Sequence, residues 1–248
     1  MKKIGIVGGI AWLSTVDYYT GLCRRSEERH IASKAPGLPS TPEMSIESLD
    51  LNRLFACLGN DGDEASWAKF DDYHREALKR VEASGADFAI IASNTPHHRF
   101  AAIVRGVRIP VISIVDAVAR ESARIGAREV LILGTRPTMR SAPFREGFTK
   151  HGVEAAAPGD ETVRAMTAEL ITELQRGKTA GAAERVNKIA TMSFEQFREQ
   201  PAVSLACTEL PLAFPDHKTL ATFEHDGVVY INSSVVHINA AFDYAIAP

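Results

Sequence analysis

The chain has 248 residues, of which 45% are hydrophobic and 24% are charged, and its formal net charge is −3. This composition is ordinary for a globular protein, and the length allows one large domain or two smaller ones. The small negative charge disfavours general nucleic-acid binding, and no apolar run approaches the ~20 residues that a membrane helix needs. Three widely spaced cysteines without a CxxC pair argue against a disulfide framework and indicate a reduced, cytoplasmic protein.

The first half of the chain alternates predicted strands with predicted helices. A short apolar run that ends at Gly8-Gly9 is typical of a buried strand, and apolar residues at three- and four-residue spacing predict a helix over 64–84. The predicted strands are 3–7, 44–50, 87–92 and 109–114, and the other predicted helices are 17–29 and 96–104. The Pro-, Ser- and Gly-rich segment 32–42 is a predicted loop.

The second half continues the alternation. The predicted helices are 117–125, 138–151, 161–176, 182–200 and 234–245, and the predicted strands are 129–133, 153–157, 202–206 and 228–231. Strands that alternate with helices of 10–20 residues predict an α/β fold, in which helices cover a parallel sheet.

A weak internal repeat divides the chain. KIGIVGG at 3–9 resembles EVLILGT at 129–135, and ASNT at 92–95 resembles ACTE at 206–209. We therefore predict two pseudo-symmetric α/β lobes: residues 1–115, completed by 228–248, and residues 116–227. All four repeated segments end strands, where ligands bind in such sheets, so we expect one active-site cleft between the lobes.

Polar side chains at these strand ends are the candidates for chemistry. Cys207 follows a buried strand, and a helix starting beside it would lower the pKa of the thiol, although a lone cysteine is also a common buried apolar residue. Ser93 and the two residues after it would cap a helix, and free amides at a helix start also bind carboxylates. The Gly8-Gly9 turn does not match GxGxxG, so we interpret it as a tight strand-end turn rather than a nucleotide site.

Two other kinds of site are disfavoured. His97 and His98 point in different directions on a helix and have no partner at ligand spacing, so no metal site is expected. The chain has no GxSxG motif, which argues against a Ser–His–Asp hydrolase.

Four segments together resemble the aspartate/glutamate racemase family: GIVGGIAWLSTVDYY, SNTPH, LGTRPTM and ACTELPL. The resemblance covers nearly the whole chain, including the final helix with His237. It implies two lobes with a cleft between them, no cofactor, a homodimer, and a small amino acid or related carboxylate as substrate. It also implies that two residues on opposite faces of the substrate remove and return the Cα proton.

The resemblance carries roles over to particular residues. It places Ser93 and Cys207 at the two catalytic positions, and Arg164 at a basic position that recognises the side-chain carboxylate in members with acidic substrates. The positions that hold the α-carboxylate correspond to Asn94, Thr95, Thr135, Thr138 and Thr208. The remaining predicted substrate contacts are Gly9, Ile10, Pro96 and Glu209.

The sequence departs from the family pattern in three places. Ser93 stands where cysteine is usual, and a serine hydroxyl is a poor base without an activator. The loop 60–64, NDGDE, is acidic, and no Lys or Arg lies between Arg53 and Lys69, which weakens aspartate and glutamate as substrates. Asn232-Ser233 stands where relatives often carry Asp-Thr.

The sequence thus predicts a cofactor-independent amino-acid racemase or epimerase that uses Cys207 and the opposed Ser93, on aspartate, glutamate or a broader set. Two alternatives remain open. One is an isomerase or decarboxylase of a small carboxylate with Cys207 as its only acid/base. The other is a catalytically silent amino-acid-binding protein.

Overall fold

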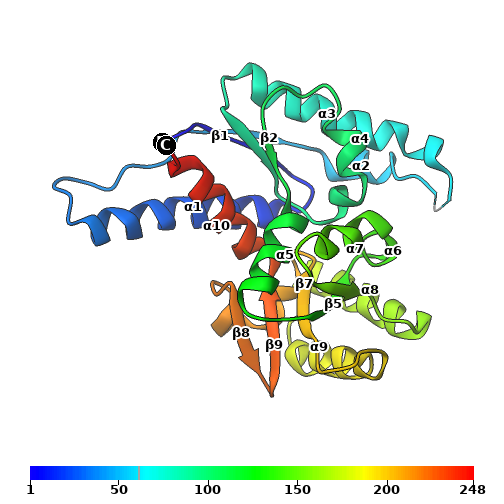
Figure 1. Ribbon diagram of the computed structural model, residues 1–248. Helices are drawn as coiled ribbons and strands as arrows, with labels where there is room; N and C mark the ends of the chain where they lie inside the picture. The colour runs from blue at the N-terminus through cyan, green and yellow to red at the C-terminus, as the bar shows by residue number, and fades with distance from the viewer. Residues whose placement is uncertain (61) are drawn as a thin grey trace. The chain divides into compact units, whose positions relative to one another are not determined.

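The computed structural model describes residues 1–60 and 62–248, and the chain divides into two compact units. The first unit comprises Met1–Ser113 with His237–Pro248, and the second comprises Ile114–Val236. Figure 1 labels their helices and several of their strands. Each unit contains a sheet whose central strands run parallel, so the predicted α/β class is confirmed.

The sheet of the first unit has the order β2-β1-β3-β4, with all pairs parallel. Its strands are β1 (Ile4–Gly8), β2 (Met44–Ser48), β3 (Phe88–Ile91) and β4 (Val111–Ile112). Its helices are α1 (Trp12–Ser33), α2 (Leu51–Phe55), α3 (Ala68–Ala83) and α4 (Phe100–Ile103), with 3-10 turns η1 (Glu64–Trp67) and η2 (Thr95–Arg99). The strands β1 and β3 are buried along their whole length, as expected for a sheet covered on both faces.

The core of the first unit has two halves because successive side chains of a strand point to opposite faces. Val7 packs in the half that contains the α3 side chains, whereas Ile6 packs in the half formed with α1 and α10 (Ser233–Ile246). A Cβ at Gly5 would lie 2.9 Å from Cγ2 of Val81, so a glycine here allows α3 to pack closely on β1.

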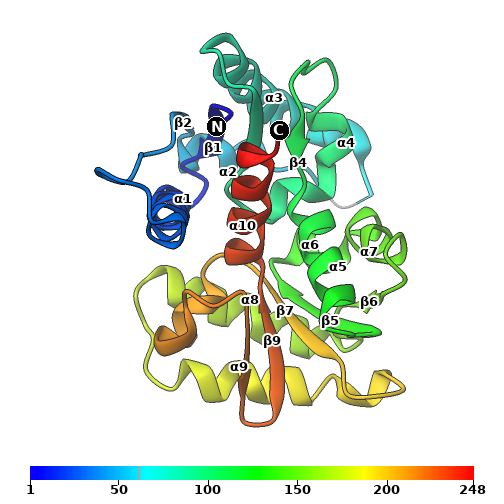
Figure 2. The ribbon, with the colours of Figure 1, turned by 60° about the vertical axis from the view of Figure 1, so that its left-hand side comes forward.

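The sheet of the second unit has the order β6-β5-β7-β9-β8, and Figure 2 shows β5, β7 and β9. Its strands are β5 (Glu129–Gly134), β6 (Glu154–Ala156), β7 (Ala202–Ala206), β8 (Thr222–His225) and β9 (Val228–Asn232), of which β8 is antiparallel to β9. The helices are α5 (Ile114–Arg124), α6 (Arg136–Arg140), α7 (Ala142–Thr149), α8 (Glu161–Gln175) and α9 (Ala182–Thr191). Three 3-10 turns are η3 (Phe194–Gln196), η4 (Leu210–Ala213) and η5 (Pro215–His217).

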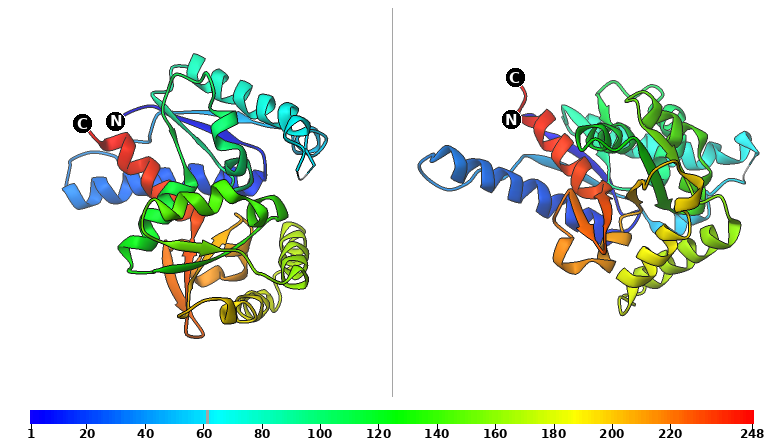
Figure 3. Two further views of the ribbon diagram at one scale, coloured as in Figure 1. Left: turned by 45° about the vertical axis from the view of Figure 1, so that its right-hand side comes forward. Right: turned by 60° about the horizontal axis from the view of Figure 1, so that its bottom comes forward.

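One hydrophobic core holds the second unit together. Side chains of α8 and α9, including Leu170 and Val186, pack against Leu131 of β5 and Leu205 of β7. The two helices also contact each other, and both views in Figure 3 draw them side by side, in yellow-green and yellow. This packing fixes the strands whose carboxyl ends carry the predicted site residues of this unit.

The two sheets repeat the same order of strands. The strands β2, β1, β3 and β4 of the first unit correspond in position to β6, β5, β7 and β9 of the second. The chain leaves each unit after the strand at the fourth position of this order. In the first unit β4 is followed by α5 of the second unit, and in the second unit β9 is followed by α10, which belongs to the first unit from His237 onward. The predicted boundary at 228 therefore moves, because β9 pairs with β7 in the second sheet and does not join the first lobe.

Three local features differ from the sequence-based expectation. The strand β8 was not expected; it forms a hairpin with β9 through Asp226 and Gly227, both at positive φ. The predicted helix 138–151 is interrupted at Ser141, whose extended backbone starts α7 and whose hydroxyl accepts a hydrogen bond from the amide of Phe144. The predicted helix 182–200 ends as α9 at Thr191. Among the described residues, no helix is both long and apolar enough to cross a membrane.

Candidate functional site

In the first unit the candidate residues follow β3. Ser93 and Asn94 are buried, and Thr95 opens η2 with Pro96 at its start. The Asn94 side chain makes no capping hydrogen bond to η2, so Asn94 does not serve as the side-chain cap that the sequence alone allows. Arg99, the last residue of η2, attaches this turn to α3. Its guanidinium donates to both carboxylate oxygens of the buried Asp71 at 3.1 and 2.8 Å.

Two buried histidines, His97 of η2 and His237 of α10, lie near the strand end at Ser93. Nδ1–H of His97 donates to the main-chain oxygen of Ser93 at 2.9 Å, so this ring supports the strand end rather than reaching the Ser93 hydroxyl through that nitrogen. The rings of His97 and His237 meet edge-on, with centroids 5.9 Å apart. Nε2–H of His237 donates to the carbonyl of Ile112 at 3.0 Å, and its Nδ1 accepts from the hydroxyl of Tyr18 at 2.8 Å. Burial lowers the pKa of His97 to about 3 and that of His237 to about 4, so both rings are neutral.

The glycine turn after β1 is closed by the protein itself. The amide of Gly9 donates to Oγ1 of Thr15 at 2.8 Å, and the φ of Gly9 is +77°. A Cβ at Gly8 would lie 2.4 Å from that same Thr15 oxygen. Ile10 packs into the core beside Leu49. These contacts agree with the interpretation of a tight strand-end turn.

In the second unit the candidate residues follow β7. The Sγ–H of Cys207 donates to Oε2 of Glu209 at 2.9 Å, and the hydroxyl of Thr208 donates to the same oxygen at 3.1 Å. Cys207 and Glu209 are both buried. A thiol and a carboxylate are thus paired at the carboxyl end of the strand.

The electrostatics of Cys207 differ from the sequence-based expectation. Burial raises the pKa of the thiol well above its usual value, and the negative charge and hydrogen bond of Glu209 raise it further. The predicted lowering by a helix start is wrong, because the segment after Cys207 is only the short turn η4, and the neighbouring backbone hydrogen bonds have the smaller effect. Cys207 therefore rests as a thiol.

The neighbouring strand ends carry the other candidates of this unit. Gly134 of β5 lies opposite Ala206 of β7, so Thr135 and Cys207 follow adjacent strands. The hydroxyls of Thr135 and the fully buried Thr138 are 3.0 Å apart. Arg164 lies in the first turns of α8, and its Nε donates to the carbonyl of Pro158 at 2.6 Å.

A family model described as Asp/Glu/hydantoin racemase matches residues 7–241. This chain belongs to that family. Broad specificity amino-acid racemase RacX of Bacillus subtilis (strain 168) is 29% identical over 151 residues, which are 61% of this chain and 62% of that relative's length. The structure also resembles that of an aspartate racemase homologue from Pyrococcus horikoshii OT3, with a TM-score of 0.74 and 29% identity over all of both chains. A putative Asp/Glu racemase from Yersinia pestis, 24% identical over all of both chains, has the same fold with a TM-score of 0.78.

The family's motif positions separate between the two units of this racemase-family chain. Ser93, Asn94, Thr95 and Pro96 share one strand end of the first unit. Gly9 and Ile10 follow β1 of the same unit. Thr135, Thr138, Cys207, Thr208 and Glu209 lie in the second unit, after β5 and β7. The acidic loop is partly described: Asp63 caps η1, and Glu64 is ion-paired with Arg99, whereas Asp61 lies outside the described residues.

Sequence reasoning missed three features of this site. It named Glu209 as a substrate contact, which stays a prediction, but it did not find that Glu209 accepts a hydrogen bond from the thiol of Cys207. It named Arg164 but not Glu161, on which Arg164 and two further arginines converge. It gave no account of Asn232, whose amide donates to the carbonyl of Lys218 at 2.9 Å and whose oxygen accepts from the amide of Val235 at the start of α10.

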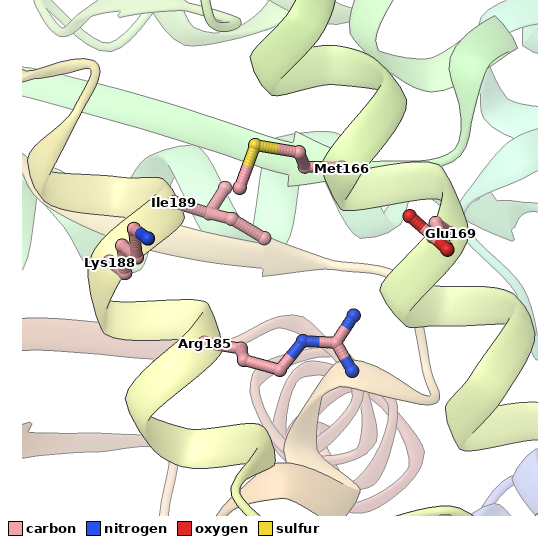
Figure 4. Close-up of a pocket in the computed structure, with 5 residues that line it drawn as sticks. All are labelled: Met166, Glu169, Arg185, Lys188 and Ile189. Carbon is pink, nitrogen blue, oxygen red and sulfur yellow. The ribbon is translucent and has the colours of Figure 1, made fainter.

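A pocket of about 180 Å³ lies elsewhere in the second unit, between α8 and α9. Figure 4 shows its lining side chains: Met166, Glu169, Arg185, Lys188 and Ile189. Arg185 is ion-paired with Glu173, and none of the predicted site residues lines this pocket. In the part of the chain that the structure describes, no three His, Cys, Asp or Glu side chains group as a metal site.

Proposed function

We propose that this chain is an amino-acid racemase or epimerase in which Cys207 transfers a proton at Cα and Ser93 serves the other face of that carbon. The observation that carries the proposal is the Cys207–Glu209 pair, a buried thiol with a carboxylate at hydrogen-bond distance. The likeness to RacX of Bacillus subtilis, named as a broad specificity amino-acid racemase, supports the same reaction.

The resting protonation state assigns the first role of the thiol. Since Cys207 rests as a thiol, it is ready to donate a proton to a Cα carbanion. To act as a base it must first lose its proton, and Glu209 is placed to receive it. The resulting thiolate takes the Cα proton on one face, and the Ser93 hydroxyl gives its proton to the opposite face of the carbanion. Water then returns a proton to Ser93, and the proton held by Glu209 is released to solvent, which leaves Cys207 as a thiol.

The carbanion needs stabilisation through the substrate's α-carboxylate. Hydrogen-bond donors that are fixed before the reaction stabilise such developing charge most effectively. The proposed donors are the strand-end groups at Asn94, Thr95, Thr135, Thr138 and Thr208. Thr138 is completely buried and is held by Thr135, so its hydroxyl needs little reorganisation.

A second candidate reaction is favoured by the serine at position 93. A hydroxyl without a strong base is a slow proton acceptor, and the bond from Nδ1 of His97 goes to the Ser93 carbonyl instead. A one-sided site would exchange the Cα proton with retention, or would protonate the carbanion left by decarboxylation, with Cys207 as the only acid/base.

The test is Cα–H exchange in heavy water with separate panels of L- and D-amino acids, followed by NMR and chiral chromatography. Exchange with loss of chirality supports the racemase, and retention supports the one-sided reaction. Cys207→Ser should abolish exchange, and Ser93→Cys should raise racemisation about tenfold or more. Unimpaired exchange in Cys207→Ser, or no racemisation in Ser93→Cys, would contradict the proposed roles.

A further inference from the structure

Three arginines of the second unit surround a single carboxylate. Arg136 and Arg140 contact Oε1 of Glu161 at 2.9 and 3.1 Å, and Arg164 contacts Oε2 at 3.5 Å. We call Arg136, Arg140 and Arg164 the arginine cluster. Asp160, the adjacent acidic residue, uses its carboxylate to cap α8 at the amide of Thr162. All three guanidinium groups therefore contact the carboxylate of Glu161.

The arginine cluster lies at the same edge of the sheet as Cys207. The helix α6, which carries Arg136 and Arg140, begins directly after β5, the strand next to β7. The helix α8 follows β6, the next strand along. Neighbouring strands are about 4.8 Å apart, so these helices start about one and two strand spacings from the strand that ends at Cys207.

A guanidinium group is the side chain best suited to bind a carboxylate, because its planar N–H donors match the two oxygens. A cluster of three such groups beside a site for an amino acid would receive an acidic substrate side chain. In this chain Glu161 already makes those contacts. A second carboxylate would lose donors to Glu161 and would be repelled by its charge.

We infer that Glu161 is a specificity-determining residue: it occupies the arginine cluster, so that the site selects amino acids with uncharged side chains over aspartate and glutamate. This inference rests on the proposed function and adds to it the class of substrate. It is independent of the acidic loop 60–64, which belongs to the first unit.

The experiment compares L-aspartate with L-asparagine, which has nearly the same shape and no side-chain charge. The variants are Glu161→Gln, Glu161→Asp and, as a matched control, Glu173→Gln, which changes a carboxylate near the other end of α8 that pairs with Arg185. Glu161→Gln should raise the aspartate-to-asparagine ratio of kcat/KM about tenfold, mainly through a lower KM for aspartate. Glu161→Asp and Glu173→Gln should leave the ratio within about twofold of the original.

Ligand-induced thermal stabilisation by the same two amino acids is measured in parallel. A ratio that Glu161→Gln leaves unchanged, or a KM change shared equally by both substrates, overturns the inference. Absence of exchange in the unmodified chain and in Ser93→Cys counts against the proposed function alone. In that case the inference stands only if aspartate stabilises Glu161→Gln more than the unmodified chain, and it fails if the two are stabilised equally.

Discussion

Cys207 shows how the surroundings of one side chain decide its chemistry. Its position after a strand suggests a reactive thiolate, whereas burial and the carboxylate of Glu209 favour the protonated thiol. A thiol that resists ionisation is a weak resting nucleophile but a competent proton donor, which suits a reaction at Cα better than covalent catalysis. Glu209 then has two effects: it raises the pKa of the thiol, and it can accept the proton.

Because of these two effects, Glu209→Gln should change two rates in opposite directions: alkylation of Cys207 should become faster and Cα–H exchange slower. Removal of the negative charge lowers the pKa of Cys207, so alkylation of Cys207 by iodoacetamide at pH 8 should become severalfold faster. Loss of the proton acceptor should at the same time reduce Cα–H exchange about 100-fold. The measurement uses a Cys23→Ser, Cys57→Ser background, since both of these thiols are partly exposed.

Glu224→Gln, which changes an exposed carboxylate on β8, is the matched control and should alter neither rate. An unchanged alkylation rate in Glu209→Gln would show that burial alone raises the thiol's pKa. Unchanged exchange would remove Glu209 from the proton path.

Among the elements, the helix α10 and the turn η2 carry the histidines that support the Ser93 strand end. His97 and His237, together with His74 of α3, are buried and neutral, with pKa values of about 3, 4 and 4. A histidine whose pKa is lowered on folding stabilises the folded state above its ordinary pKa of about 6.5, and this contribution is lost as the pH falls toward the lowered value. The first unit therefore contains an acid-sensitive core.

We expect the free energy of unfolding to fall between pH 6.5 and pH 4.5 by up to about 1.4 kcal/mol per pH unit for each of these histidines. His237→Gln keeps an acceptor for Tyr18 and a donor for Ile112 but does not titrate, so it should reduce the slope by about one histidine's share. Urea unfolding at pH 6.5, 5.5 and 4.5 measures the slope. His30→Gln, at an exposed contact with Gly37, should leave it unchanged, and an equal reduction there would refute the assignment.

The elements that the sequence predicts well are those whose signal is local. The strands β1, β3, β5 and β7 are continuous apolar runs, and α3 has a clear periodicity. The sequence also contains a local signal for the hairpin of β8 and β9: Asp226-Gly227 is a dipeptide typical of tight hairpin turns, and it lies between two short apolar segments. The pairing of Cys207 with Glu209, and the convergence of three arginines on Glu161, depend on side-chain positions that no sequence spacing determines.

At the scale of the whole molecule, the internal repeat predicted from short motifs corresponds to a repeated order of strands. Ser93 and Cys207 follow β3 and β7, and Gly9 and Thr135 follow β1 and β5, which are the corresponding strands of the two sheets. The chain passes into the other unit after β4 and again after β9. The predicted boundary at 228 misplaced β9 because short motifs do not show that β9 pairs with β7. Equivalent positions thus carry the motif residues, although one holds a serine and the other a thiol.

The homodimer implied by the family resemblance stays a prediction, and the surface of α1 offers a place for it. Trp12, Val16 and Tyr19 lie at i, i+4 and i+7 of this helix and are 69%, 50% and 44% exposed. Such spacing places the three side chains on one face, and apolar and aromatic residues gathered in this way are typical of protein interfaces. We expect a second copy of the chain to cover this face.

A charge in the middle of the face should separate the copies, because a buried unpaired carboxylate is costly at an interface. Val16→Glu is therefore expected to halve the mass measured by light scattering after size-exclusion chromatography, while the circular dichroism spectrum stays unchanged. Met192→Glu places the same charge at a side chain of the second unit that is 48% exposed, and it should leave the mass unaltered. A monomeric unmodified chain, or a dimer that survives Val16→Glu, would mean that this face of α1 has another role.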